Sequence, residues 1–407
     1  MKALAAASAF ALLVSIPLHA AEIWQEQRTV PDDASAGSQF GCAASLDGTL
    51  ALIGADGENG SHGAAYFYEK SDAGWTVKQK IEPDDPAAAE FGFRTALKDG
   101  LAIVTADMSG PNGNSGQGSG YVFERDDAGT WSQTRILLAD DGAAFDNFGS
   151  AIALDGDRLV IGAHGAQVGD NFAQGAAYFF QHTDAGWVQA QKILADDGAL
   201  NDNFGQSAAM VGDTLFIGAN GATIDGAAFQ GAVYVFHFDG AAWVQVQKLA
   251  ETEGAMFDYF GLSVAFDGTK LLVGATQSGS TGAVYAFTND GSGWAEQQRL
   301  TVDDLVAFAD FGNAIALHGD DALIASDVQT VDGSTSRGAA YLFHYDGASW
   351  SLRHTFVSSD GTTDDFFGNA VGYDGTTALI STLHPNGFEG AAYFYTSDSL
   401  FGDGFDG

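Results

Sequence analysis

Cysteine, basic residues and proline are all scarce in this chain of 407 residues. The single cysteine, Cys42, excludes an intramolecular disulfide, so a large hydrophobic core must hold the fold together. Only 16 Lys and Arg accompany 53 Asp and Glu, and the formal net charge of −37 argues against nucleic acid or anionic membranes as partners. The 6 Pro are outnumbered by 54 Gly, which indicates many tight turns.

Long hydrophobic runs are confined to the beginning of the chain. Residues 1–20, MKALAAASAFALLVSIPLHA, have one early Lys, an apolar run and a terminal Ala, which is typical of a signal peptide cleaved after Ala20. This run is too short for a membrane anchor, and no other apolar stretch nears 18 residues. We therefore expect no membrane insertion, and an exported protein that is secreted, periplasmic or held at the cell surface.

The rest of the chain is one unit written seven times. The dipeptide Phe-Gly recurs at steps of 51 to 57 residues, and tryptophan recurs with nearly the same spacing. The phenylalanines are Phe40, Phe91, Phe148, Phe204, Phe260, Phe311 and Phe367. The tryptophans are Trp24, Trp75, Trp131, Trp187, Trp243, Trp294 and Trp350, which are all the tryptophans of the protein.

The third unit shows what one repeat contains. Four strand-like runs, SAIAL, RLVIGA, GAAYFF and WVQAQKIL, are separated by two tight turns and one long connection. Four antiparallel strands repeated seven times predict an all-β fold, a seven-bladed β-propeller spanning residues 21–395. The first runs are rich in small residues, which suits strands that crowd together around the axis of a ring.

The order of the repeated residues also predicts how the ring closes. The last Phe-Gly, at Phe367, is followed by three strand-like runs and by no tryptophan. The first tryptophan, Trp24, lies in IWQEQRTV, a fourth strand that has no unit of its own. We therefore expect this N-terminal strand to complete the last blade, with Trp24 beside residues 390–395, because closure removes an exposed sheet edge.

These repeats resemble the FG-GAP repeat, the propeller unit of integrin α-chains and of many bacterial exported proteins. The resemblance covers nearly all of the mature chain and includes Phe148-Gly149, LVIGA at 159–163 and GAAYFF at 175–180. It implies the propeller fold. By similarity to integrins, it also implies a ligand-binding face built from the loops between strands two and three and the loops between blades. A fold of this kind does not specify a function.

The end of the chain, residues 396–407, is expected to lie outside the propeller as an acidic tail. It includes SLFGDGFDG, which resembles short tails on some exported proteins of Gram-negative bacteria, where a sorting role is suspected. A disordered acidic tail is the alternative interpretation. The resemblance favours a Gram-negative bacterial source.

Calcium is the cofactor that the resemblance raises. In the integrin-type repeat, the loop between strands one and two often carries a D-x-D-x-D-G calcium motif. Here that loop is a short turn such as LDGDRL at 154–159, which cannot supply six or more oxygen ligands. The blade-to-blade loops are acidic, with pairs such as Asp140 and Asp141, and these acids could bind calcium or basic groups, or could cap turns. We expect no cofactor, with calcium as the open possibility.

The loops between strands two and three vary most among the units, which is where a specific site would lie. The candidate ligand-face residues are His62, His164, Asp170, Asp225 and His384. No catalytic motif is present, so our first hypothesis is a monomeric, non-catalytic binding or adhesion propeller for an extracellular protein or glycan. The alternative is a carbohydrate-active enzyme with acids in the central funnel, which should show a few carboxylates of strongly raised pKa in one pocket.

Overall fold

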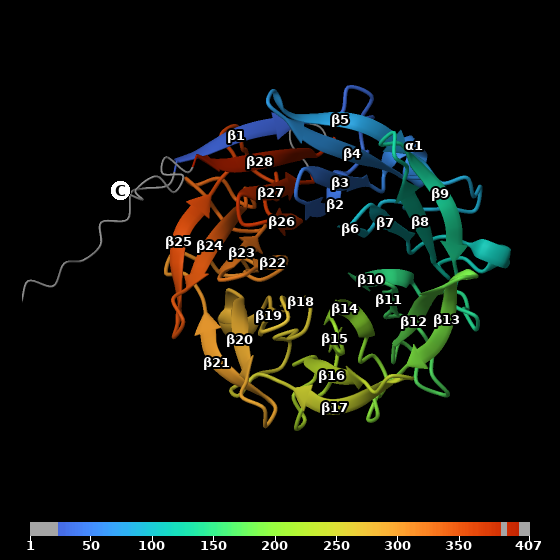
Figure 1. Cartoon of the computed structure of the whole chain (residues 1–407). Coiled ribbons are helices and arrows are strands. Elements are labelled where there is room, and N and C mark those ends of the chain that lie inside the picture. The colour runs from blue at the N-terminus through green and yellow to red at the C-terminus, as the bar shows by residue number, and fades with distance from the viewer. Residues whose placement is uncertain (1–22, 384–388, 399–407) are drawn as a thin grey trace, which may run out of the picture.

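The computed structural model describes residues 23–383 and 389–398. The expected signal peptide at 1–20, His384 and residues 399–407 lie outside this range. The described residues form seven four-stranded antiparallel sheets, arranged as blades around one axis (Figure 1). The predicted all-β, seven-bladed propeller is confirmed.

Each blade places its first strand next to the axis and its fourth strand on the outside (Figure 1). Blade 1 contains β2 (Phe40–Asp47), β3 (Leu50–Ala55), β4 (Ala64–Ser71) and β5 (Gly74–Ile81). Blade 2 contains β6 (Thr95–Lys98), β7 (Leu101–Ala106), β8 (Ser119–Arg125) and β9 (Trp131–Leu137). Blade 3 contains β10 (Phe148–Asp155), β11 (Arg158–Ala163), β12 (Ala176–Thr183) and β13 (Gly186–Ile193). Blade 4 contains β14 (Phe204–Val211), β15 (Thr214–Ala219), β16 (Ala232–Phe238) and β17 (Trp243–Leu249).

The remaining three blades follow the same plan. Blade 5 contains β18 (Ser263–Phe266), β19 (Lys270–Ala275), β20 (Ala283–Asn289) and β21 (Trp294–Leu300). Blade 6 contains β22 (Ile315–His318), β23 (Asp321–Ser326), β24 (Ala339–Tyr345) and β25 (Trp350–Phe356). Blade 7 contains β26 (Val371–Tyr373), β27 (Thr377–Thr382), β28 (Ala391–Asp398) and β1 (Ile23–Thr29). Loops between second and third strands hold the short turns α1 (Glu58–Ser61), η1 (Pro111–Gly113) and η2 (Ser278–Ser280).

The ring closes as predicted, because β1 pairs antiparallel with β28 as the outer strand of blade 7. The register differs slightly from the prediction. Trp24 lies opposite Ser397, whereas Thr29 lies opposite Ala392. Trp24 therefore lies just beyond the expected range of 390–395, since β28 continues through Asp398 and past the expected end of the propeller at 395.

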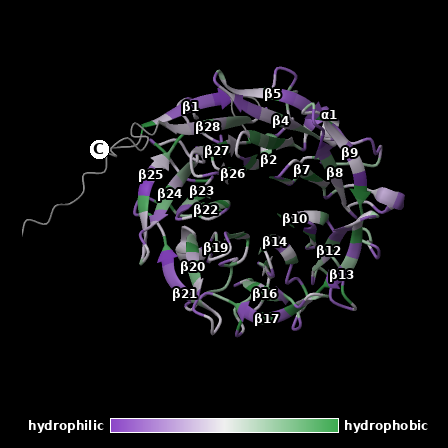
Figure 2. Cartoon of the chain, in the orientation of Figure 1, coloured by the Kyte–Doolittle hydropathy of each residue, from purple (hydrophilic) through white to green (hydrophobic). Residues whose placement is uncertain are grey.

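The core lies between neighbouring blades, in seven separate clusters of buried side chains. Every Phe of the Phe-Gly dipeptides is fully buried and packs edge-to-face on a Tyr of the third strand in its own blade, as Phe148 does on Tyr178 with ring centroids 5.6 Å apart. Hydrophilic residues concentrate on outer strands such as β1 and β21 (Figure 2). The second and third strands of each blade are therefore mostly buried, whereas the fourth strands are partly exposed to solvent.

An inner ring of hydrogen bonds joins each blade to the next through the glycine of Phe-Gly. These glycines have φ between 89° and 117°, a region that other residues rarely adopt, and a Cβ at Gly205 would lie 2.4 Å from the carbonyl oxygen of Ala176. Each glycine carbonyl accepts a side-chain hydrogen bond of 2.6–3.2 Å from the preceding blade. The pairs are Cys42–Gly92, Thr105–Gly149, Ser150–Gly205, Ser207–Gly261, Ser263–Gly312, Asn313–Gly368, and Asn369 and Ser381 with Gly41.

An outer set of clamps uses glutamine. In five of the seven interfaces, a Gln amide of one fourth strand makes two hydrogen bonds of 2.6–2.9 Å with the backbone N–H and C=O of the next blade's Trp. The pairs are Gln27–Trp75, Gln79–Trp131, Gln191–Trp243, Gln247–Trp294 and Gln298–Trp350. The Gln lies four residues after its own Trp in strands that carry a β-bulge and three residues after Trp24 in β1, whose pairing has no bulge.

Candidate binding face

The loops between strands two and three and the loops between blades lie together on one face, here called the loop face. Backbone hydrogen bonds join the two sets directly. Phe145 N–H donates to the carbonyl of Ser115, and Asn201 N–H donates to that of Phe172, each at 3.0 Å. At the end of the long loop, the Gly that precedes the third strand forms a short parallel bridge with the Phe of the next blade's Phe-Gly, as Gly118 does with Phe148. Each long loop is therefore fixed against the start of the following blade.

The loop face exposes large apolar side chains. The described residues include fourteen exposed large hydrophobic side chains, and half of them point outward from fourth strands. The other half lie on the loop face. These seven are Met108, Phe145, Phe172, Leu200, Met256, Phe257 and Phe308. Exposed apolar side chains that gather on one face are candidates for an interaction site.

Three of these phenylalanines share one position, three residues before a Phe-Gly. Phe145, Phe257 and Phe308 have φ of 67°, 68° and 62°, a left-handed conformation that is uncommon for bulky residues. The interblade hydrogen bonds hold this conformation, as for Phe257, whose N–H donates to the carbonyl of Ala228 at 3.0 Å. Asn201 and Asp364 have the same conformation at the same position, with φ of 62° and 64°, so it belongs to the connection between blades. A phenylalanine just before a strand resembles a core residue in the sequence, so its exposure could not be predicted from the sequence.

Aromatic rings from blades 4 and 5 meet on this face. Phe229 and Phe257 stack with ring centroids 5.5 Å apart and planes 12° apart, and Tyr259 lies 6.2–6.3 Å from both. Phe257 is 47% exposed, and Phe229 and Tyr259 are half-buried. These three residues, here called the aromatic cluster, form one group of partly exposed rings on the loop face.

The acids of the blade-to-blade loops serve the fold. Asp141 accepts hydrogen bonds from Tyr178 at 2.9 Å and Lys192 at 2.6 Å, and these contacts lower its pKa although burial alone would raise it. Asp146 accepts a hydrogen bond from the backbone N–H of Ala143 at 2.8 Å, as turn-capping residues do. The same pair of roles recurs in the next unit, at Asp197 and Asp202.

The candidate residues named from the sequence do not converge on one site. Asp170 and Asp225 are exposed on the loops of blades 3 and 4, and His62 Nε2 lies 3.3 Å from the carbonyl oxygen of Asp85. His164 is half-buried near the axis, where burial lowers its pKa, and its Nδ1 has no hydrogen-bond partner. Among these four described residues, no hydrogen bond or ion pair joins any two. His384 is outside the described residues.

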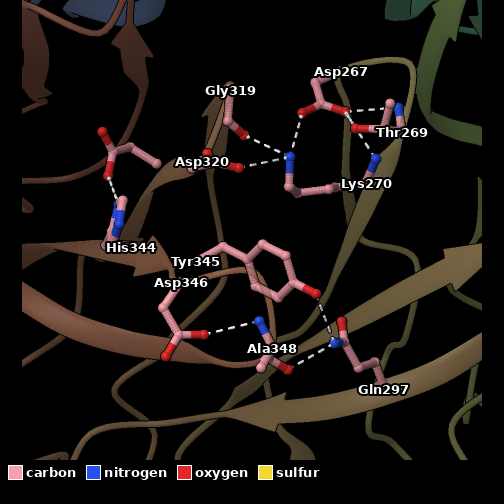
Figure 3. Close-up of polar contacts among 11 residues, drawn as sticks. Asp267, Thr269, Lys270, Gln297, Gly319, Asp320, His344, Tyr345, Asp346 and Ala348 are labelled. Carbon is pink, nitrogen blue, oxygen red and sulfur yellow. Dashed lines mark hydrogen bonds and ion pairs between the residues drawn. The ribbon is translucent and has the colours of Figure 1, made fainter.

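The opposite face carries the short turns in which integrin-type repeats bind calcium. In blade 5, Asp267 accepts hydrogen bonds from the backbone N–H groups of Thr269 and Lys270, at 2.7 and 2.8 Å (Figure 3). The Lys270 ammonium lies 3.4 Å from Asp267 and 3.1 Å from Asp320 of the next blade. A side-chain cation thus balances these carboxylates. In the described part of the chain, no three His, Cys, Asp or Glu side chains are grouped closely enough to hold a metal ion.

A cavity of about 430 Å³ lies on the propeller axis. First strands of all seven blades line it with small residues, together with Arg94 from blade 2 and Asp327 from blade 6. Burial raises the pKa of Asp327 and of Asp107 to about 7, and that of Asp56 to about 6. These are raised-pKa carboxylates of the kind that the enzyme hypothesis anticipated, although they belong to three different blades.

The family model for the FG-GAP repeat matches this chain at 24–68, 131–180, 187–236, 243–287, 294–343 and 350–395. The chain belongs to the FG-GAP repeat family. Each matched segment begins at a Trp and ends within a third strand, so the family's unit joins one blade's fourth strand to three strands of the next. The unit at 75–123, which supplies Arg94, lies outside the matched segments.

No curated protein matches the chain. Within the described residues, no helix has the length and hydropathy that a membrane span requires. The FG-GAP repeats establish the fold of the chain, whereas its function depends on individual residues of the loop face and of the axis.

Proposed function

We propose that this FG-GAP propeller is an exported, monomeric, non-catalytic binding protein whose loop face docks a protein partner with a basic surface. The observation that supports this proposal is the set of exposed aromatic and aliphatic side chains on the loop face. Aromatic residues surrounded by polar ones are the usual energetic centre of protein interfaces. The aromatic cluster of Phe229, Phe257 and Tyr259 is the centre of the proposed contact.

The negative charge of the protein favours a partner with a basic surface. The net charge is −37, and exposed acids such as Asp170, Asp225 and Glu253 lie on the same loops as the apolar residues. A basic partner is attracted to such a surface over a distance, and its Arg or Lys side chains can lie over the exposed rings. Apolar anchors and acidic surroundings therefore favour the same partner.

The stiffness of the loops favours binding rather than catalysis by loop closure. Backbone hydrogen bonds fix both loop sets, so little conformational entropy is lost when a partner docks. The residues that vary between blades are displayed on a ring of constant geometry. This is the arrangement by which a repeat fold presents a specific surface.

Binding to defined polypeptides tests this proposal. The purified protein is passed over immobilised poly-L-lysine, poly-L-glutamate and a peptide of alternating lysine and leucine, at 50 and 300 mM salt. We expect the lysine–leucine peptide to bind most tightly, poly-L-lysine to bind more weakly with strong salt dependence, and poly-L-glutamate not to bind. Equal retention on all three, or none, would contradict the proposal.

A second function has one observation in its favour. Asp107 and Asp327, with pKa values raised to about 7, could donate or accept a proton at neutral pH beside the axis cavity. We infer from this a carbohydrate-active enzyme as the second candidate. Incubation with oligosaccharides, followed by mass analysis for shortened products, distinguishes it from a binding protein. Product that disappears in Asp327→Asn would favour the enzyme.

A further inference from the structure

The axis cavity contains one cation that has no ionic partner. Arg94 enters it from blade 2, and burial lowers the pKa of its guanidinium. In the part of the chain that the structure describes, this guanidinium makes one hydrogen bond, from Nη1 to the carbonyl oxygen of Phe93 at 3.0 Å, and no ion pair. The guanidinium also lies over the Phe93 ring, with Cζ 4.2 Å from the ring centroid, and its other N–H donors have no protein acceptor among the described residues.

A set of unpaired polar atoms recurs at one position of the repeat, and one of them lies in the cavity lining. The residue that directly follows the second strand carries a buried oxygen or nitrogen without a hydrogen-bond partner in five of the seven blades. These atoms are Oδ1 of Asp56, Asp107, Asn220 and Asp327, and Nδ1 of His164. Asp56 and Asp107 are only 7% and 5% exposed. Native proteins leave few buried polar atoms unpaired, and five at one repeat position call for a common explanation.

One of these five residues belongs to the cavity lining. Asp327 lines it directly, with the unpaired Oδ1 of Asn313 from the same blade. Asp56 and Asp107 interact electrostatically with Arg94, and Arg94 does so with His164. The second strands end on the loop face, so these five residues lie on that side of the propeller.

The combination of charges excludes simple ions as ligands. A small anion at Arg94 would lie close to Asp56 and Asp107, and a small cation at those acids would lie close to Arg94. A neutral molecule that both donates and accepts hydrogen bonds meets neither repulsion. Hydroxyl groups do both, donating to a carboxylate and accepting from a guanidinium.

We propose that the axis cavity binds a neutral polyhydroxylated ligand of monosaccharide size, with hydroxyl groups between Arg94 on blade 2 and Asp327 on blade 6. The volume of about 430 Å³ falls in the range of small-molecule sites. Small residues such as Ala151 and Ala208 supply flat apolar wall for the C–H faces of such a ring. This site is independent of the protein-docking function proposed for the aromatic cluster.

Blade 2 departs from the repeat in the way such a site requires. Arg94 directly precedes the first strand β6, at a repeat position where the other six blades have Ala or Ser. In the same blade, Thr105 occupies the position of Gly162 in blade 3, and its hydroxyl takes over the interblade hydrogen bond to Gly149 at 2.8 Å. Ser381 of blade 7 makes the equivalent hydrogen bond to Gly41 at 2.7 Å, so the departure peculiar to blade 2 is Arg94, the one cation of the cavity lining among the described residues.

Saturation-transfer NMR on the full chain tests the proposal. The probes are glucose, galactose, mannose and xylose, with glucuronate and glucosamine as charged comparators. We expect saturation transfer to at least one neutral sugar. Arg94→Met and Asp327→Asn should each weaken that binding at least tenfold. Arg158→Met, a matched change of an arginine on the opposite face, and Phe257→Ser, on the loop face, should leave it unchanged.

Three results would overturn the proposal. They are an absence of transfer to every neutral sugar, transfer to the charged comparators alone, or equal affinity in Asp327→Asn and the original protein. The isosteric Asp327→Asn variant keeps the test valid if Arg94→Met does not fold. Phe257→Ser changes the loop face and not the axis cavity. A failure of sugar binding would therefore say nothing against the proposed docking function, which the peptide experiment tests.

Discussion

The side-chain amide of Gln27 makes two hydrogen bonds with the backbone of Trp75, at 2.6 Å to the carbonyl oxygen and 2.8 Å from the N–H. Gln27 lies in β1, the strand that completes blade 7, and Trp75 begins the outer strand of blade 1. Trp75 in turn stacks on Phe394 of blade 7 with ring centroids 4.4 Å apart. The closing strand β1 therefore completes the sheet of blade 7 and also bonds blade 7 to blade 1.

Replacing Gln27 by Ala should lower the free energy of unfolding by about 1–3 kcal/mol, because two hydrogen bonds are lost and the Trp75 backbone is left unpaired. Gln27→Glu keeps the acceptor for the Trp75 N–H and should cost less. Urea denaturation followed by tryptophan fluorescence measures both. Equal stability of Gln27→Ala and the original protein would show that the clamp contributes nothing.

Removing residues 23–29 should have a much larger effect, because β28 then becomes an exposed edge and the Trp24 packing on Phe356 is lost. We expect the truncated protein to lose its cooperative thermal transition or to melt well below the full chain. Circular dichroism on heating is the measurement. An unchanged midpoint would contradict the closure of the ring by β1.

The inner ring predicts opposite effects for two exchanges. Cys42 donates through sulfur to Gly92 at 3.2 Å, and Ser150 donates through oxygen to Gly205 at 2.9 Å. A thiol is a weak donor, so Cys42→Ser should stabilise the fold by up to about 1 kcal/mol and Ser150→Cys should destabilise it by a similar amount. Urea midpoints of both variants check this. Changes of the same sign would show that size, rather than hydrogen bonding, decides at these positions.

Stability should rise as the pH falls from 8 to 5. Burial raises the pKa of Asp56 to about 6 and that of Asp107 and Asp327 to about 7, from an ordinary value of 3.8. A folded state with raised pKa values binds protons more tightly than the unfolded chain, so its stabilisation is complete below about pH 4 and is lost as the pH rises through 7. Below about pH 4, carboxylates of lowered pKa such as Asp141 act in the opposite direction.

Thermal midpoints at pH 5 and 8 measure this dependence. Asp327→Asn should reduce the difference between the two midpoints, whereas Asp170→Asn, on an exposed loop, should not. A midpoint that is higher at pH 8 than at pH 5 would contradict the assignment.

Calcium should have little effect on stability. The Lys270 ammonium already lies between Asp267 and Asp320, and Asp267 also accepts backbone hydrogen bonds. We expect the thermal midpoint to change by less than ~1 °C between millimolar calcium and excess EDTA, because only a ligand of the folded state shifts it. A rise of several degrees with calcium would refute this prediction and favour calcium-dependent adhesion.

The fold could be predicted from the sequence because the information repeats. One Phe-Gly is a weak signal, but Phe148 and its six counterparts at regular spacing together predict seven equivalent blades. The strand at Trp24, which has no unit of its own, predicts how the ring closes. The register of that strand was missed by a few residues, since nothing in the sequence fixes where β28 ends.

The candidate site was less accessible to sequence reasoning. Phe257 precedes a buried Phe-Gly and looks like a core residue, and its exposure follows from a left-handed backbone that only the neighbouring loop imposes. Arg94 could have been noticed as a charge at a position where the other six units have Ala or Ser. The unpaired atoms of Asp56 and Asp107 could not have been predicted from the sequence, because they depend on which side chains the closed ring places within hydrogen-bond distance.

Two serine variants test whether the loop face binds a partner through its exposed rings. Phe257→Ser and Val246→Ser each remove a large exposed apolar side chain, the first from the loop face and the second from the outer strand β17, where Val246 is 61% exposed. Their dissociation constants for the lysine–leucine peptide are measured by surface plasmon resonance at 50 mM salt. We predict at least tenfold weaker binding for Phe257→Ser and unchanged binding for Val246→Ser. Equal binding by the two variants would contradict the claim.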